Sequence, residues 1–215
     1  MKVSLLDYGA GNLHSLSKAL ELGGAEVVTT ASWDEALATD ALILPGVGSF
    51  GAAVRALDGF QDRVREALAS GLPCLGICLG MQLLFSSSDE GEGEGIGLIP
   101  GRVVRLEAAT VPQMGWNDVV PAGNRGPDPL FPDGTGLTAY YANSFVCAPE
   151  DSTTILAWSE VDGTRFPASV RAHNTWGVQF HPEKSSAPGL GLIRRFLDQV
   201  GPGSGTPAPT EGGGA

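Results

Sequence analysis

The chain has 215 residues, of which 42% are hydrophobic, and a formal net charge of −11. These values are typical of one soluble globular domain, and they argue against nucleic acid or an anionic membrane as a general partner. No apolar run is long enough to span a membrane, and no basic leader precedes the first strand pattern. Three cysteines without metal-site spacing fit a reduced, cytoplasmic setting, and we expect no cofactor and no metal.

The first part of the chain alternates strand and helix patterns. Strands are predicted at 2–8, 26–29, 41–44 and just before Cys78, with helices at 13–22, 33–38 and 52–70, the last broken near Asp58. This order predicts an α/β fold with a doubly wound, mostly parallel central sheet of flavodoxin-like type. In such a sheet, ligands collect at the carboxyl ends of the strands.

The second part of the chain has a different character. Residues 89–95 form an acidic, glycine-rich loop pattern. Short strand patterns at 101–106, 118–120, 138–146, 155–159, 168–171 and 177–180 predict a small antiparallel extension of the sheet. A last amphipathic helix is predicted at 190–200. We expect a single domain over 1–200, followed by a disordered Gly/Pro-rich tail at 201–215.

The segment 72–84 runs from a strand pattern through Gly76-Ile77-Cys78-Leu79-Gly80 into a helix start. This order is typical of a nucleophile elbow, in which a sharp turn holds the central residue in a strained conformation. A helix beginning there would direct its N-terminal N–H groups and positive dipole end at the sulfur, which favours the nucleophilic thiolate. Taken alone, Cys78 could equally be a buried hydrophobic residue.

A second strand end carries His181 and, two residues later, Glu183. In extended chain, residues i and i+2 point to the same side, so both side chains can face one site. A carboxylate beside an imidazole fixes its tautomer and stabilises its charged form. Cys78, His181 and Glu183 therefore form a candidate catalytic triad of nucleophile, base and orienting acid.

The third strand pattern leads into Pro45–Gly48. Glycines at a strand end allow backbone N–H groups to approach a ligand, although a tight turn would look the same. Beside a cysteine nucleophile, Gly46, Val47 and Gly48 become a candidate oxyanion hole. The N–H of Leu79, directly after the nucleophile, is the second candidate donor.

Together, Pro45–Gly48, Gly76–Gln82 and Phe180–Glu183 resemble the three ordered signatures of class I, triad-type glutamine amidotransferases. Residues 112–117 and 7–12 are further similar to the glutaminase subunits of imidazole glycerol phosphate synthases. The resemblance covers residues 1 to about 200. It implies that Cys78 attacks the side-chain amide of glutamine, that His181 relays protons and that Glu183 orients His181.

The resemblance also implies binding residues and a partner. Gln82 and Glu90 would help to hold the substrate glutamine, and backbone groups around Ser144 and Phe145 its α-carboxylate. Released ammonia would pass to a cyclase subunit of (β/α)₈ barrel type in a heterodimer, which makes imidazole glycerol phosphate and an aminoimidazole carboxamide ribotide in histidine biosynthesis. The implied contacts with the cyclase are Asn12, Gln113, Met114, Trp116, Asn117, Tyr140 and Lys184.

One position departs from the family pattern, because Asn143 stands where a histidine is common. Asparagine can still form hydrogen bonds but cannot take up charge. Three other interpretations stay open at this point: the glutaminase of another synthase, for anthranilate or pyridoxal phosphate; another cysteine hydrolase on a similar scaffold; and a non-catalytic binding subunit. Residues 112–117 favour histidine biosynthesis, and the intact triad argues against the non-catalytic subunit.

Overall fold

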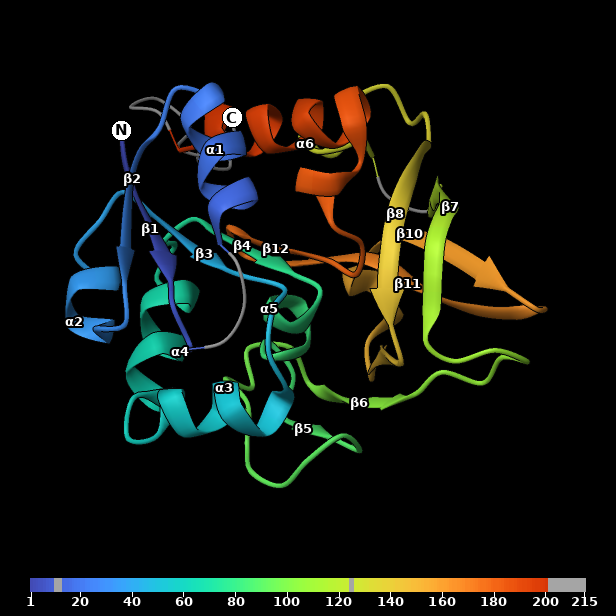
Figure 1. Cartoon of the computed structure of the whole chain (residues 1–215), viewed down its shortest axis with the longest axis horizontal. Coiled ribbons are helices and arrows are strands. Elements are labelled where there is room, and N and C mark those ends of the chain that lie inside the picture. The colour runs from blue at the N-terminus through green and yellow to red at the C-terminus, as the bar shows by residue number, and fades with distance from the viewer. Residues whose placement is uncertain (10–12, 124–125, 201–215) are drawn as a thin grey trace, which may run out of the picture.

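The structure is a computed structural model that describes residues 1–9, 13–123 and 126–200. Within these residues the chain forms an α/β fold with a nine-stranded mixed sheet and a separate three-stranded sheet (Figure 1). The predicted fold class is confirmed. The predictions for Asn12 and for the tail at 201–215 lie outside the described residues. No helix in the described part of the chain has both the length and the apolar composition needed to cross a membrane.

The parallel half of the large sheet has the strand order β2-β1-β3-β4-β12. Its central strands are apolar and fully buried because helices cover both faces. The predicted strands of the first part are confirmed within one or two residues at each end. The five strands are β1 Lys2–Leu6, β2 Glu26–Thr30, β3 Ala41–Leu44, β4 Cys74–Ile77 and β12 Thr175–Val178.

Two layers of helices cover this half (Figure 1). Helices α1 and α6 pack on one face, where Leu20 and Phe196 are fully buried, and α2, α3 and α4 cover the other. The predicted break in 52–70 is confirmed near Gly59, which has a positive φ of 78°. The helices are α1 His14–Leu22, α2 Trp33–Ala36, α3 Phe50–Leu57, α4 Gln61–Ala69, α5 Leu79–Gln82 and α6 Ser186–Asp198.

The antiparallel half of the large sheet is more extensive than the small extension predicted from the sequence. It adds β11, β10, β7 and β8 after β12. Each of these four strands is antiparallel to every strand that it pairs with in this sheet. The strand predicted at 118–120 belongs to a nine-residue strand. These strands are β7 Gln113–Pro121, β8 Leu137–Asn143, β10 Ile155–Val161 and β11 Thr164–Ala172.

The single strand predicted at 138–146 is wrong, because the chain changes sheets at Ser144. β8 ends at Asn143 in the large sheet, and the carbonyl of Ser144 accepts from the N–H of Leu106 at 2.9 Å. The chain then enters the three-stranded sheet, which has the order β5-β6-β9. Its strands are β5 Ser87–Ser88, β6 Gly101–Arg105 and β9 Phe145–Pro149, and short 3₁₀ turns lie at Ser152–Thr154 and Pro182–Lys184.

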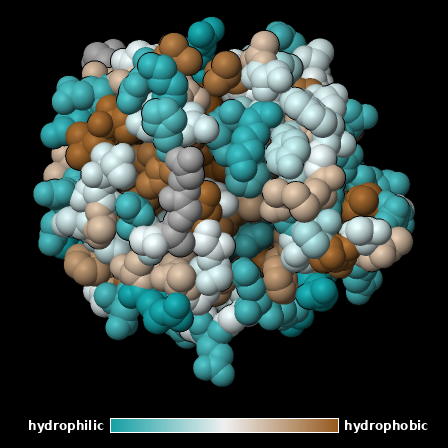
Figure 2. Space-filling model, in the orientation of Figure 1, coloured by the Kyte–Doolittle hydropathy of each residue, from teal (hydrophilic) through white to brown (hydrophobic). Residues whose placement is uncertain are grey.

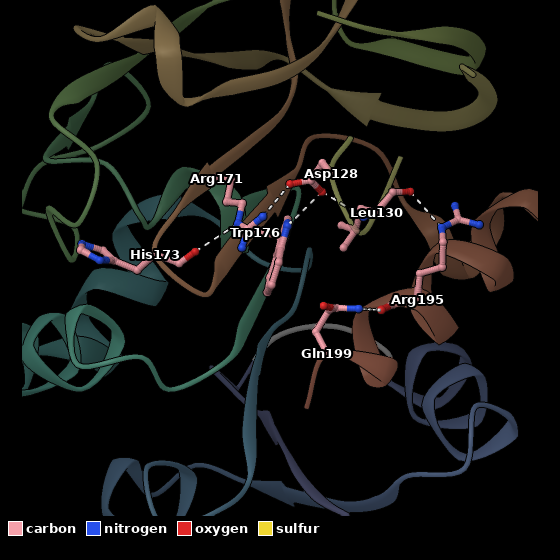
Figure 3. A network of polar contacts seen from close by, with 7 residues as sticks. All are labelled: Asp128, Leu130, Arg171, His173, Trp176, Arg195 and Gln199. Carbon is pink, nitrogen blue, oxygen red and sulfur yellow. Dashed lines mark hydrogen bonds and ion pairs between the residues drawn. The ribbon is translucent and has the colours of Figure 1, made fainter. Parts of the chain in front are cut away.

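A buried carboxylate ties the loop before β8 to the parallel half (Figure 3). Asp128, which is 8% exposed, accepts from the N–H of Leu130 at 2.9 Å and from Trp176 Nε1 at 3.2 Å. It also pairs with Arg171 Nη1 at 2.9 Å, and the Arg171 guanidinium lies 4.4 Å from the Trp176 ring centroid. The carbonyl of Leu130 in turn accepts from Arg195 Nε of α6 at 2.9 Å. One side chain thus joins a loop, two strands and, through Leu130, a helix.

We predict that Asp128→Ala lowers the free energy of unfolding by about 2–4 kcal/mol, because it leaves Arg171 and the Trp176 N–H without their partner. Asp133→Ala removes an exposed carboxylate from the same loop and should change this free energy by less than about 0.5 kcal/mol. Urea unfolding followed by circular dichroism measures both. Equal effects of the two variants would contradict the proposed role of Asp128.

Candidate active site

The predicted elbow is present at Cys78, between β4 and α5. Cys78 has φ 47° and ψ −102°, a backbone conformation that non-glycine residues rarely adopt. Neighbouring glycines make the turn possible: a Cβ on Gly76 would lie 2.6 Å from the carbonyl oxygen of Gly80, and one on Gly80 would lie 2.0 Å from that of Leu44. The turn therefore requires glycine at both positions.

The predicted helix after the elbow is present but short. α5 is a single turn of four residues, Leu79–Gln82, and all four are buried. A helix macrodipole arises from many aligned peptide groups, so one turn contributes little of it. What remains from the prediction is the local effect of the first backbone N–H groups, including that of Leu79.

Three neighbouring strands bring the site together at their carboxyl ends. β3 leads into Gly46, β4 into Cys78 and β12 into His181, and these strands are adjacent in the sheet. A Cβ on Gly46 would lie 3.0 Å from Cys78 Cβ and 2.8 Å from His181 Cε1. The Cys78 N–H donates to the carbonyl of Val178 at 2.7 Å. The predicted nucleophile, base and glycine loop therefore lie in one place.

His181 is paired with Glu183 as the sequence pattern predicts, although by a different backbone. His181 Nδ1 and Glu183 Oε1 are 2.9 Å apart, and their side chains are 4% and 8% exposed. The prediction of extended chain from His181 to Glu183 is wrong, because Pro182–Lys184 forms a 3₁₀ turn. Proline at the first position of that turn has the fixed φ that a helical start requires.

The backbone of His181 is fixed by β8. Its N–H donates to the carbonyl of Tyr140 at 2.8 Å, and its own carbonyl accepts from Ser185 Oγ at 2.6 Å. The same Ser185 oxygen accepts from the N–H of Tyr140 at 2.9 Å. His181 is therefore held between the antiparallel half of the sheet and the start of α6.

The electrostatic surroundings favour a charged imidazole. Burial lowers the pKa of His181. Hydrogen bonds to the Cys78 sulfur and to Glu183, together with their negative charges, raise it by more than burial lowers it, so the pKa rises from 6.5 to about 9. The Cys78 sulfur is thus in direct interaction with the imidazole. A thiolate beside an imidazolium, itself beside a carboxylate, is an arrangement suited to nucleophilic attack on a carbonyl.

A residue missing from the sequence prediction also contacts the sulfur. Gln179, which is fully buried, donates from Nε2 to Cys78 Sγ at 3.5 Å. Gln82 Nε2 donates to Gln179 Oε1 at 3.4 Å and to the carbonyl of Phe145 at 3.2 Å. The sequence did contain a signal, because Gln179 lies two residues before His181 at the end of a strand, where side chains two apart share a side.

The other residues expected at the site lie around this cluster. The Glu90 carboxylate, on an exposed residue, accepts from the N–H of Phe50 at 3.2 Å, just after the glycine loop. Asn143 donates from Nδ2 to the carbonyl of Phe145 at 3.1 Å. In the described part of the chain, the buried Asn143 Oδ1 has no hydrogen-bond partner. Of the predicted glutamine-binding residues, Gln82 is therefore joined to the Gln179 side chain and to Phe145, Glu90 contacts the segment after the glycine loop, and the Ser144 carbonyl is used by Leu106.

Several residues of the predicted partner surface lie together on the strands β7 and β8. Met114 and Trp116 are 68% and 55% exposed, and Trp116 packs edge-on against Tyr140 with ring centroids 6.2 Å apart. Lys184 Nζ lies 6.0 Å from the Tyr140 ring centroid. Gln113 is buried, and Asn117 donates to the carbonyl of Glu160 at 2.9 Å. Figure 2 shows hydrophobic residues among hydrophilic ones on the side where Figure 1 draws these strands.

The described residues contain no group of three or more His, Cys, Asp or Glu side chains that could hold a metal ion.

The model of the family glutamine amidotransferase class-I matches residues 4–200. The chain belongs to the class-I glutamine amidotransferase family. This match argues against the alternative of an unrelated cysteine hydrolase on a similar scaffold.

Relatives of this glutamine amidotransferase are similar over nearly their whole length. The imidazole glycerol phosphate synthase subunit HisH of Thermus thermophilus is 44% identical over 204 residues, which cover 92% of this chain and 99% of that protein. The subunit of the same name from Natronomonas pharaonis is 41% identical, with coverage of 92% and 94%. The solved structure of PurLQS from Thermotoga maritima has a TM-score of 0.73 at 22% identity, covering 93% of this chain and 99% of that one. That likeness concerns the fold alone.

The raised pKa of His181 predicts a dependence of stability on pH. A folded-state pKa of about 9 against 6.5 in the unfolded chain means that the contribution is complete below pH 6.5 and is lost as pH rises through 9. We expect the wild-type free energy of unfolding to fall by about 3 kcal/mol more than that of His181→Gln between pH 6 and pH 10. Urea unfolding at several pH values measures this difference, and parallel pH profiles of the two proteins would contradict it.

Proposed function

We propose that the chain is the glutaminase subunit of an imidazole glycerol phosphate synthase. It hydrolyses glutamine to glutamate and ammonia and passes the ammonia to a cyclase partner. The observation that carries the proposal is the contact of Cys78, His181 and Glu183 at the ends of adjacent strands. Sequence identity of 41% and 44% to two HisH subunits, over 92% of the chain, supports the choice of synthase.

The reaction begins with attack of the Cys78 thiolate on the side-chain amide carbon of glutamine. The tetrahedral intermediate collapses when the imidazolium of His181 gives its proton to the leaving nitrogen, which departs as ammonia and leaves a thioester. His181, now neutral, takes a proton from water, which attacks the thioester. Glutamate leaves, and the sulfur becomes a thiolate again. Glu183 keeps His181 oriented through Nδ1 and stabilises its positive charge in each step.

Negative charge on the intermediate's oxygen is stabilised by backbone donors. We assign this role to the N–H of Leu79 and to the loop of Gly46, Val47 and Gly48. The loop passes beside the nucleophile and the base, since a side chain on Gly46 would touch both. A single donor of this kind is commonly worth about 10²–10³ in rate. A turned peptide in this loop would direct a carbonyl at the substrate, which makes the loop the candidate switch that keeps the free subunit slow.

We assign recognition of glutamine to Gln82 and Glu90 and to backbone groups of Ser144 and Phe145. The carboxylate of Glu90 suits the substrate's α-ammonium group, and backbone N–H groups suit its α-carboxylate. The link from Gln82 to the carbonyl of Phe145 supports a shared role for these two residues.

The partner is proposed to be a cyclase of (β/α)₈ barrel type that forms a heterodimer with this chain. It adds ammonia to a phosphoribulosyl formimino aminoimidazole carboxamide ribotide, giving imidazole glycerol phosphate and an aminoimidazole carboxamide ribotide in histidine biosynthesis. The exposed residues Met114 and Trp116, with the half-buried Tyr140 beside them, support a docking surface on β7 and β8, next to Lys184. Exposed aromatic residues of this kind are common interface anchors.

Replacing the nucleophile should abolish the activity. We expect Cys78→Ala to reduce glutaminase activity of the assembled complex by at least about 10⁴-fold, because the covalent route is lost. Cys74→Ala is the matched control: this thiol is fully buried in β4, the strand that leads to Cys78, and burial raises its pKa. It should retain activity within about threefold. Glutamate release measured with and without the nucleotide substrate tests both, and full activity of Cys78→Ala would refute the assigned chemistry.

The docking surface can be tested separately from the chemistry. We expect Trp116→Ala to weaken binding of the cyclase by about 30-fold, the usual effect of losing an aromatic anchor. Leu22→Ala, which removes an equally exposed apolar side chain from the far end of α1, should leave the affinity within about twofold. Titration calorimetry with purified cyclase gives both values. Binding to an anthranilate synthase partner instead of the cyclase would contradict the proposed pathway.

A further inference from the structure

The sulfur of Cys78 has a second polar neighbour besides the base. The amide of Gln179 lies 3.5 Å away, through Nε2, and Gln179 is fully excluded from solvent. Gln179 and His181 follow the end of β12 two residues apart, with the fully buried Phe180 pointing into the core between them. The strand therefore delivers two polar groups to the same atom.

The direction of this hydrogen bond is fixed by a chain of donors and acceptors. The carbonyl of Phe145 can only accept, so the Gln82 side chain must turn its NH₂ group toward it, at 3.2 Å. The same Nε2 then donates to Gln179 Oε1 at 3.4 Å. With its oxygen engaged by Gln82, Gln179 has only its NH₂ group left to face the sulfur. A flipped Gln179 amide would set two donors against each other.

Two titratable groups interact with the Cys78 sulfur, and neither takes the position that the Gln179 amide occupies. His181 contacts the sulfur and is itself paired with Glu183. Cys147 is the other thiol close enough to interact electrostatically with Cys78, and burial raises its pKa well above the usual value, so it stays neutral. Among the described residues, His181 is a cation in contact with the sulfur, and the Gln179 N–H is a neutral side-chain donor in contact with it.

We propose that Gln179 is a catalytic residue that donates a hydrogen bond to the Cys78 thiolate, with Gln82 as the positioning residue that fixes its orientation. The inference rests on the proposed function only in taking Cys78 as the nucleophile. A donor on an anion stabilises the charged form, so Gln179 increases the fraction of sulfur that is reactive at neutral pH. Because Gln82 is also assigned to the substrate, glutamine binding and the state of the sulfur share one side chain.

The test is alkylation of Cys78 in the full-length chain by iodoacetamide, followed by intact mass spectrometry at pH 7 and pH 10. Gln179→Met keeps the length of the side chain but removes the donor. We expect it to react about tenfold more slowly than wild type at pH 7, which corresponds to one charge-assisted hydrogen bond, and the deficit to shrink toward pH 10. Cys78→Ala gives the background from the two buried thiols, Cys74 and Cys147.

Thr175→Val is the matched control. It makes a nearly isosteric change at a fully buried position of β12, the strand that leads to Gln179. The hydroxyl it removes has no hydrogen-bond partner in the described part of the chain. It should react within about twofold of wild type at both pH values. Should Gln179→Met fail to fold, as judged by circular dichroism, Gln82→Met serves instead, because it frees the Gln179 amide. We expect a deficit of about threefold at pH 7 for that variant.

Equal rates for wild type and Gln179→Met at pH 7 would overturn the inference, as would a deficit of the same size at both pH values, which marks a packing defect. These outcomes leave the proposed function intact. The proposed function fails instead if Cys78→Ala keeps its glutaminase activity in the complex, a result that does not depend on Gln179.

Discussion

The site depends on one backbone constraint, the positive φ of Cys78 between β4 and α5. This conformation turns the chain sharply where β4 ends, so that the sulfur lies at the carboxyl ends of three adjacent strands. It persists because the surrounding packing determines it: Gly80 lies against the backbone of β3, and Gly76 against the first turn of α5. The glycine loop and His181 then meet the sulfur because their strands are the neighbours of β4 on either side.

Local sequence patterns predicted four of the five strands of the parallel half; the fifth, β12, was expected in the antiparallel extension but pairs in parallel with β4. Buried strands such as Ala41–Leu44 are short, wholly apolar and bounded by turn residues, and these properties depend on neighbouring residues alone. The break near Gly59 is also a local signal, and it is present in the structure. The elbow was predictable for the same reason. A sharp turn at Cys78 leaves no room for a Cβ atom at Gly76 or Gly80, so the turn requires glycine on both sides of the cysteine.

The antiparallel half was harder to predict, because its strands are defined by their partners. Residues 138–146 have a continuous strand pattern, yet the chain leaves one sheet for the other at Ser144. Along β7, exposed residues alternate with residues that are buried or half-buried, but the half-buried Gly115 and Asn117 hide that alternation in the sequence. The role of Gln179 was missed because an amide has no strong chemical signature until its neighbours are known. The 3₁₀ turn at Pro182–Lys184 was also missed, because the pattern from His181 to Glu183 was interpreted as extended chain.

The backbone of Tyr140 belongs to two parts of the molecule at once. Its carbonyl and N–H hold the His181 segment from one edge of β8, while its ring lies against Trp116 and Lys184 at the outer surface. One residue of β8 therefore contacts both the backbone of His181 and the aromatic cluster at the surface. A molecule bound against that ring would therefore contact the same residue whose backbone holds His181 in place.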